Sequence, residues 1–122
     1  MKKNTLIETT DLCLSFLTAS GKLQILNSVN FSLYEKETVA LVGPSGSGKS
    51  SLLMLLGGLE ESNSGSINIF GNDITKMSED QLANLRKKTM GIVFQSFHLI
   101  PTITALDNVC IPLELVGYSE VK

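Results

Sequence analysis

Residues 43–50 read Gly-Pro-Ser-Gly-Ser-Gly-Lys-Ser, a complete G-x-x-x-x-G-K-[ST] loop. The pattern requires glycines, because only residues without a Cβ let consecutive backbone N–H groups turn inward around a polyphosphate. These glycines are Gly43, Gly46 and Gly48. We expect Lys49 to place its ammonium beside the β- and γ-phosphates and Ser50 to offer its hydroxyl to Mg²⁺. The loop is therefore predicted to bind the phosphates of a nucleotide.

The segments on either side of the loop predict a strand and a helix. Thr38–Val42 is a short apolar run with β-branched residues, and Ser51–Leu56 is rich in strong helix formers. A phosphate loop between a strand and a helix is the order that this chemistry requires, because the positive end of the helix dipole then points at the anion. The pattern predicts an α/β fold.

Further strands are expected before and after this unit. Leu6–Phe16 and Ile25–Tyr34 alternate apolar and polar residues around a turn at Thr18–Gly21, which predicts an antiparallel pair. Ser66–Phe70 is predicted as another strand, and Met90–Gln95 as one more.

Two further helices are predicted by their capping residues. Ser78 and Gln81 fit a capping box, so a helix should run from Ser78 to about Lys88. A second helix should begin near Thr104, with Pro112 bending it and Gly117 near its end.

Composition limits the size of the protein and the class of its partners. The chain has 122 residues, 43% hydrophobic content and a net charge of −2, which suits at most one domain with a modest core. The one basic cluster, Arg86-Lys87-Lys88, suits a helix C-terminus, so no nucleic-acid partner is expected. No run of eighteen apolar residues and no signal-peptide core is present, which predicts a cytoplasmic protein unless a partner carries it to a membrane.

Cysteine and histidine usage predicts neither a metal centre nor a catalytic triad. Cys13 and Cys110 are isolated and are expected to be buried free thiols. His98, the only histidine, is expected in a loop.

The order of motifs resembles the first half of an ABC-transporter ATPase subunit. After the loop come Leu-Gly-Gly-Leu at 56–59, Ser64-Gly65 and Gly-Ile-Val-Phe-Gln-Ser-Phe-His-Leu-Ile-Pro at 91–101. Asp-Ile-Thr at 73–75 and Thr-Ala-Leu-Asp-Asn-Val at 104–109 are most similar to the LolD, MacB and YbbA group. The resemblance implies a P-loop NTPase fold with an N-terminal antiparallel β subdomain. Residues 1–122 would form part of a nucleotide-binding domain, with the β subdomain and P-loop core to about 95 and the start of a helical subdomain at 96–122.

The resemblance also assigns roles to individual residues. Gln95 matches the glutamine that contacts Mg²⁺ and the attacking water, so Ser50 and Gln95 are the expected metal-binding residues. Phe16 lies where an aromatic ring usually stacks on adenine, and a place in the core is the alternative. Lys36 replaces a common turn glycine, which predicts strain in that turn. The expected nucleotide-binding residues are Gly43, Pro44, Ser45, Gly46, Ser47, Gly48, Lys49, Ser50, Ser51 and Phe16.

The family's remaining motifs lie beyond the last residue of this sequence. The LSGGQ signature, the acidic strand, the catalytic glutamate and the switch histidine are not among the 122 residues, so the resemblance implies a truncated domain that binds ATP and Mg²⁺ without hydrolysing ATP alone. Exposed apolar edges are expected at the strands around residues 39–41 and 92–94, because the family places two later strands between them.

In the intact family, two such subunits sandwich Mg-ATP and drive a membrane permease that handles lipoproteins, lipids or amphiphilic compounds. The resemblance implies permease docking near Phe97–Val109 and a peripheral position at the cytoplasmic face of the inner membrane. Two alternatives stay open. One is a non-catalytic remnant or split-gene half that binds nucleotide, and the other is a small P-loop kinase, which the two strands before the loop disfavour.

Overall fold

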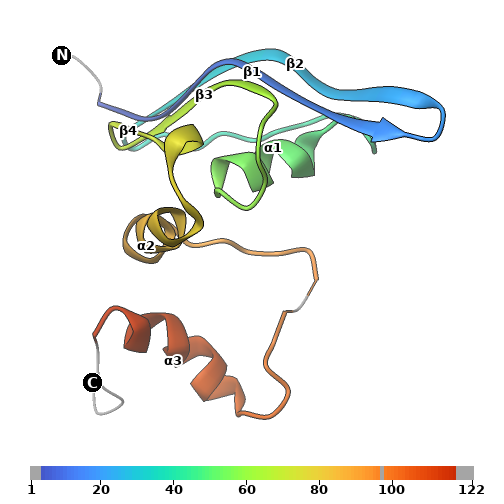
Figure 1. Cartoon of the computed structure of the whole chain (residues 1–122). Helices are drawn as coiled ribbons and strands as arrows, with labels where there is room; N and C mark the ends of the chain where they lie inside the picture. The colour runs from blue at the N-terminus through green and yellow to red at the C-terminus, as the bar shows by residue number, and fades with distance from the viewer. Residues whose placement is uncertain (1–3, 97, 118–122) are drawn as a thin grey trace. The chain divides into compact units, whose positions relative to one another are not determined.

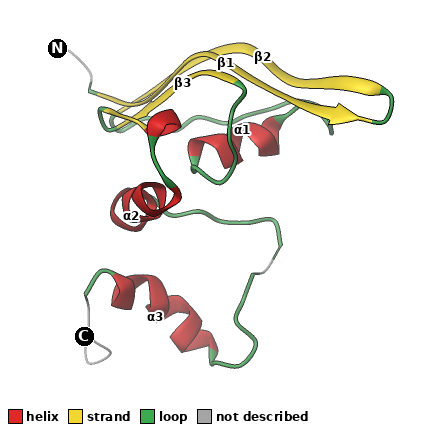
Figure 2. Ribbon diagram, in the orientation of Figure 1, coloured by secondary structure: helices red, strands yellow, loops and turns green. Residues whose placement is uncertain are grey.

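The computed structural model describes residues 4–96 and 98–117 of the chain. They divide into two compact units, Met1–Leu82 and Ala83–Lys122, and each unit is described by itself. Figure 1 gives the element labels, and Figure 2 shows the same view by secondary structure.

An antiparallel sheet forms the first unit. Its strands are β1 (Thr5–Thr18), β2 (Gly21–Tyr34), β3 (Ser64–Ile69) and β4 (Asn72–Asp73), in the order β2-β1-β3-β4. The predicted antiparallel pair is confirmed as β1 and β2, which are joined by a turn at Thr18 and Gly21 (Figure 1). The sequence also predicted β3, but its pairing with β1 and the short β4 were not foreseen.

The centre of β1 is bent by register shifts against both of its neighbours. Asp11 takes a left-handed backbone (φ +47°), and its N–H donates to Asn30 Oδ1 at 3.1 Å. The backbone of β1 here comes so close to β3 that a Cβ on Gly65, at φ +88°, would overlap the Asp11 carbonyl. Only glycine fits at this crossing.

Helix α1 (Lys49–Leu56) lies beneath one face of this sheet (Figure 1). Leu52 and Leu55 are the buried residues of the helix, and they face a core supplied by alternate positions of the strands. The buried apolar side chains are Leu12, Leu14, Leu26, Leu52, Leu55, Ile67, Ile69 and Ile74. The core therefore places the helix that follows the glycine-rich loop firmly against the sheet.

The predicted strands at Thr38–Val42 and Met90–Gln95 do not form. Both segments lack regular secondary structure, because no strand of the described residues pairs with either. Their apolar side chains are correspondingly exposed, to 88% at Val42 and 99% at Val93. Exposed apolar side chains are therefore present at these segments, as expected, although neither segment is a strand edge.

The turn before residues 38–42 has the strain that the sequence predicted. Lys36 adopts φ +64°, a left-handed conformation that costs a residue with a Cβ roughly 1 kcal/mol more than glycine. The turn holds Glu37 close enough for the Tyr34 N–H to donate to its Oε2 at 2.8 Å.

Two short elements complete the first unit and lead into the next. A 3₁₀ helix, η1 (Ile74–Lys76), was not predicted, whereas the predicted capping box opens α2 (Glu79–Thr89). The Ser78 N–H donates to Gln81 Oε1 at 2.9 Å, and the Gln81 N–H donates to Ser78 Oγ at 3.3 Å.

Helix α3 (Ala105–Leu115) of the second unit begins and ends close to the predicted positions. Thr104 caps it by accepting the Asp107 N–H at 3.1 Å, Pro112 lies inside it, and Gly117 follows with φ +103°. None of its described side chains is buried.

The cysteines differ from the prediction in their burial. Cys13 and Cys110 are free, as expected, but each is only half-buried. The Ser28 N–H donates to Cys13 Sγ at 3.3 Å, and this backbone hydrogen bond is the main cause that lowers the pKa of the Cys13 thiol. Cys13 lies next to a register shift between β1 and β3, and Cys110 lies on α3, which has no buried side chain among its described residues.

Candidate functional site

The glycine-rich loop between residue 42 and α1 is closed by the side chain of Lys49. Its ammonium donates to the carbonyl oxygens of Gly43 at 2.5 Å and Pro44 at 2.8 Å, and lies 3.5 Å from Ser47 Oγ. A turn within the loop is closed by the Ser47 N–H, which donates to the Pro44 carbonyl at 3.2 Å. One positive charge is thus held at the mouth of a loop made almost entirely of small residues.

Gly48 joins the loop to the first turn of α1. It occupies the N-cap position with φ +95° and has no side chain with which to cap the helix. A Cβ at this position would lie 3.1 Å from the Ile25 carbonyl of β2, so the sheet packs directly against the loop. The first N–H groups of α1 have no partner within the helix, and the positive end of the helix dipole adds to the Lys49 charge.

The two serines after Lys49 lie in the first turn of α1. Ser50 is exposed and Ser51 is half-buried. Together with the loop, they form one continuous stretch of the chain that supplies backbone N–H groups, hydroxyls and one ammonium. This set of donors fits a polyphosphate with its Mg²⁺ ion, because every group offers positive charge, a hydrogen-bond donor or a hydroxyl oxygen for the metal.

Phe16 lies near the end of β1, opposite Leu23 of β2. Its side chain is 43% exposed, which does not match a place in the core. A ring on the surface of the sheet retains a free π face. Adenine stacking by Phe16 stays a prediction.

Gln95 belongs to the second unit, whereas the loop and Phe16 belong to the first. It lies in a bend, just after Phe94. The Phe94 ring contacts the His98 ring in a tilted arrangement, with centroids 4.6 Å apart and the planes inclined by 53°. As expected, His98 lies in a loop, and its backbone is left-handed (φ +48°). A contact between Gln95 and Mg²⁺ stays a prediction.

The expected docking segment is largely exposed. Phe97 lies outside the described residues, but Leu99, Ile100 and Pro101 are all exposed, and Val109 is 70% exposed on α3. At 70% exposure, Val109 does not pack beneath α3.

Asn108 is the residue of this segment that sequence reasoning missed. Its Oδ1 accepts the Ile100 N–H at 2.8 Å, and its Nδ2 donates to the carbonyls of Ile100 at 3.2 Å and Thr104 at 2.8 Å. It thereby fixes the loop to α3 through both backbone polar groups of one residue, Ile100. An asparagine four residues after a helix cap, next to an irregular segment, was the available signal.

Comparison with known proteins identifies the family. A family model described as "ABC transporter" matches residues 26–122. The lipoprotein-releasing system ATP-binding protein LolD of Hahella chejuensis is 46% identical over 102 residues, which cover 84% of this chain and 44% of LolD. The uncharacterized ABC transporter ATP-binding protein YbbA of Escherichia coli K12 is 43% identical over 122 residues, which cover all of this chain and 54% of YbbA.

A solved structure agrees with these relatives. The ATP-binding cassette MJ0796, described as a dimer in a post-hydrolysis state bound to ADP and Pi, superposes with a TM-score of 0.89 at 32% identity, over 93% of this chain and 49% of MJ0796. This match confirms the predicted P-loop ATPase fold with its antiparallel β subdomain.

The chain spans about half the length of the relatives named above. Among the described residues, no helix is both long enough and apolar enough to cross a bilayer. The matches favour the predicted resemblance over a small P-loop kinase, and they confirm the similarity to the LolD and YbbA type. The chain belongs to the ABC-transporter ATP-binding family.

Proposed function

We propose that this chain is the nucleotide-binding part of an ABC-transporter ATPase that couples Mg-ATP to a membrane permease for lipoproteins, lipids or amphiphilic compounds. The observation that carries the proposal is the Lys49 ammonium held at 2.5 and 2.8 Å from the loop carbonyls, directly before α1. The names of the relatives, which include a lipoprotein-releasing system ATP-binding protein, support the transport class.

Each residue of the loop would act on the phosphates in a different way. Lys49 would exchange its carbonyl contacts for the β- and γ-phosphates, while the Gly48 N-cap leaves the first amides of α1 free to donate. Ser50 would hold Mg²⁺, with Gln95 as its second protein contact. The ion would neutralise phosphate charge.

The proposed partners are a second ATPase subunit and a permease. The named structural relative is a dimer, which supports the former. For the permease, we propose a docking surface of Leu99, Ile100, Pro101 and Val109, held to α3 by Asn108. These partners would hold the chain at the cytoplasmic face of the membrane.

Calorimetry with ATP tests the nucleotide site directly. Lys49→Ala should weaken ATP binding by at least tenfold, because it removes the one charge at the loop mouth, and omission of Mg²⁺ should weaken it as well. Lys87→Ala removes an equal charge from an exposed position of α2 and should leave the affinity unchanged. Equal ATP affinities for the wild type and Lys49→Ala would contradict the proposal.

Co-purification tests the docking surface. In a complete LolD-type subunit that carries residues 95–109 of this chain, Leu99→Asp should reduce permease co-purification and transport while ATP binding is retained. Leu115→Asp, introduced in the same way with residues 95–115, places the same charge at another exposed leucine and serves as the control. Unchanged transport in the Leu99→Asp subunit would place docking elsewhere.

A second candidate function is nucleotide binding without turnover. The 122 residues supply the loop, Lys49, Ser50 and Gln95, but the resemblance assigns none of them as the base that activates water. A phosphate-release assay on this chain should therefore show no turnover above that of Lys49→Ala.

A further inference from the structure

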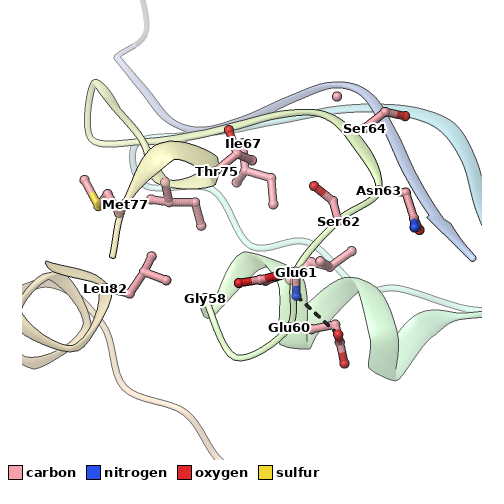
Figure 3. A pocket seen from close by; sticks show the side chains of 13 residues that line it. Gly58, Glu60, Glu61, Ser62, Asn63, Ser64, Ile67, Thr75, Met77 and Leu82 are labelled. Carbon is pink, nitrogen blue, oxygen red and sulfur yellow. Dashed lines mark hydrogen bonds between the residues drawn. The ribbon is translucent and has the colours of Figure 1, made fainter. Parts of the chain in front are cut away.

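A pocket of about 360 Å³ lies in the first unit, at the end of α1 remote from the glycine-rich loop. It is enclosed by the end of α1, the segment from Gly58 to Ser64, β3, η1 and the start of α2. Figure 3 shows the apolar side chains of Ile67 in β3, Met77 between η1 and α2, and Leu82 in α2 converging on this space. Its volume falls at the lower end of the range for small-molecule sites.

Aliphatic side chains form one part of the pocket lining, and the polar residues Ser62, Asn63, Ser64 and Thr75 form another. Leu55, Ile67 and Ile74 form the aliphatic floor, and at most 5% of each of these side chains is exposed. Met77 and Leu82 continue the apolar surface to the half-exposed rim. An alkyl group placed here would bury its surface against aliphatic side chains.

The rim on the side of the Gly58–Ser64 segment carries negative charge. Glu60 and Glu61 both line the pocket, and its lining residues include no lysine, arginine or histidine. The Glu61 N–H donates to Glu60 Oε1 at 3.2 Å, so the Glu60 carboxylate is turned back onto the backbone (Figure 3). The Glu61 side chain extends toward Leu82 and is the free carboxylate at the opening (Figure 3).

The end of α1 adds to this negative field. The last turn of α1 contains no basic residue that would offset the negative end of the helix dipole. The pocket therefore combines an aliphatic floor with a rim that favours cations. Its ligand chemistry differs from that of the loop at the other end of α1, which favours anions.

We propose that this pocket binds a small organic monocation with a short apolar tail, such as an alkylammonium ion. The tail would lie against Leu55, Ile67 and Ile74, and the ammonium would lie at the Glu61 carboxylate. A metal site is not indicated here, because the described residues contain no group of three or more His, Cys, Asp or Glu side chains that could hold a metal ion. A carboxylate ligand of equal length would be repelled at the rim.

The test follows methyl resonances of the 122-residue chain by NMR as three six-carbon probes are added. Hexylammonium should shift the methyls of Leu55, Ile67 and Ile74 saturably. Hexan-1-ol should bind about fivefold more weakly, since it loses an ion pair of roughly 1 kcal/mol, and hexanoate more weakly still. Leu106, exposed on α3, reports non-specific binding.

A matched pair of variants tests the role of Glu61. Glu61→Gln should weaken hexylammonium binding about fivefold and leave hexan-1-ol binding unchanged. Glu60→Gln removes the same charge from the adjacent residue, whose carboxylate accepts a backbone N–H, and should weaken binding by less than twofold. Both positions are exposed, so the fold should be retained.

Three outcomes would overturn the proposal. They are equal affinities for hexylammonium and hexan-1-ol, unchanged hexylammonium binding in Glu61→Gln, and equal shifts at Leu106 and at the floor of the pocket. None of them bears on nucleotide binding, since the probes and the variants lie outside the glycine-rich loop.

Discussion

The first unit and the second unit are ordered by different interactions. Every buried apolar side chain of the described residues belongs to the first unit, where the sheet and α1 enclose them. The second unit has no buried side chain among its described residues, and it relies on local hydrogen bonds such as those of Thr104 and Asn108. The comparison indicates that the glycine-rich loop rests on a packed core, whereas the apolar side chains of the second unit are exposed.

The largest expected effect contrasts a buried leucine with an exposed one. Leu12→Ala in β1, where the side chain is fully buried, should lower the free energy of unfolding by about 2–5 kcal/mol. Leu106→Ala in α3, where it is 71% exposed, should change it by about 0.5 kcal/mol or less. Urea unfolding measures both variants, and equal losses would remove the distinction between the units.

A smaller effect is expected within the second unit. Asn108→Ala should release the Ile100 N–H, whose hydrogen bond is worth about 1 kcal/mol, and should raise its exchange rate with solvent about fivefold. Asn84→Ala, at an exposed position of α2, controls for the loss of an amide. If the Ile100 exchange rate stays constant in Asn108→Ala, the loop is held by other contacts.

The strained turn of the first unit gives a prediction of opposite sign. Lys36→Gly should raise the free energy of unfolding by about 0.5–1 kcal/mol, because glycine accepts φ +64° without a steric cost. Lys22→Gly, in the regular part of β2, should lower it by a similar amount. Thermal unfolding of the pair distinguishes turn strain from a general effect of losing a lysine side chain.

The smallest expected effect depends on pH. Hydrogen bonds from the Thr75 hydroxyl and from the Thr75 N–H (3.1 Å), together with Lys76 at 3.8 Å, lower the pKa of Asp73 below 3.8. Because its pKa is lower in the folded state, the ionised Asp73 carboxylate stabilises the fold above pH 3.8. This stabilisation is lost as the pH falls through the folded-state pKa. Asp73→Asn should therefore cost about 0.5 kcal/mol or less at pH 7, and this cost should shrink toward pH 2. A difference that stays constant with pH would show that the Asp73 charge does not contribute.

The sequence predicted those parts of the fold whose signals are local. The capping box at Ser78, the Thr104 cap and the alternation of β1 and β2 each reside within a few residues, and all were confirmed. The segments 38–42 and 90–95 carried equally good strand patterns, but a strand also needs a pairing partner, and none of the described strands supplies one.

The same contrast applies to the candidate site. The loop could be predicted because its glycines, lysine and serine form one contiguous pattern, and Lys49 lies within the loop as expected. The role of Asn108 could not be predicted, because Asn108 contacts Ile100, eight residues earlier in the chain. Ile100 lies in a segment whose sequence has no periodic pattern. The pocket below β3 was also unforeseen, since it combines residues from five separate segments.

Amide hydrogen exchange with and without Mg-ATP tests most directly that the loop before α1 holds the phosphates. We predict that the amides of Gly46, Gly48, Lys49 and Ser50 become at least tenfold more protected at saturating Mg-ATP, and that Lys49→Ala abolishes this protection at the same concentration. Unchanged exchange of these four amides in the wild type, with ATP bound as judged by calorimetry, would show that the nucleotide binds elsewhere.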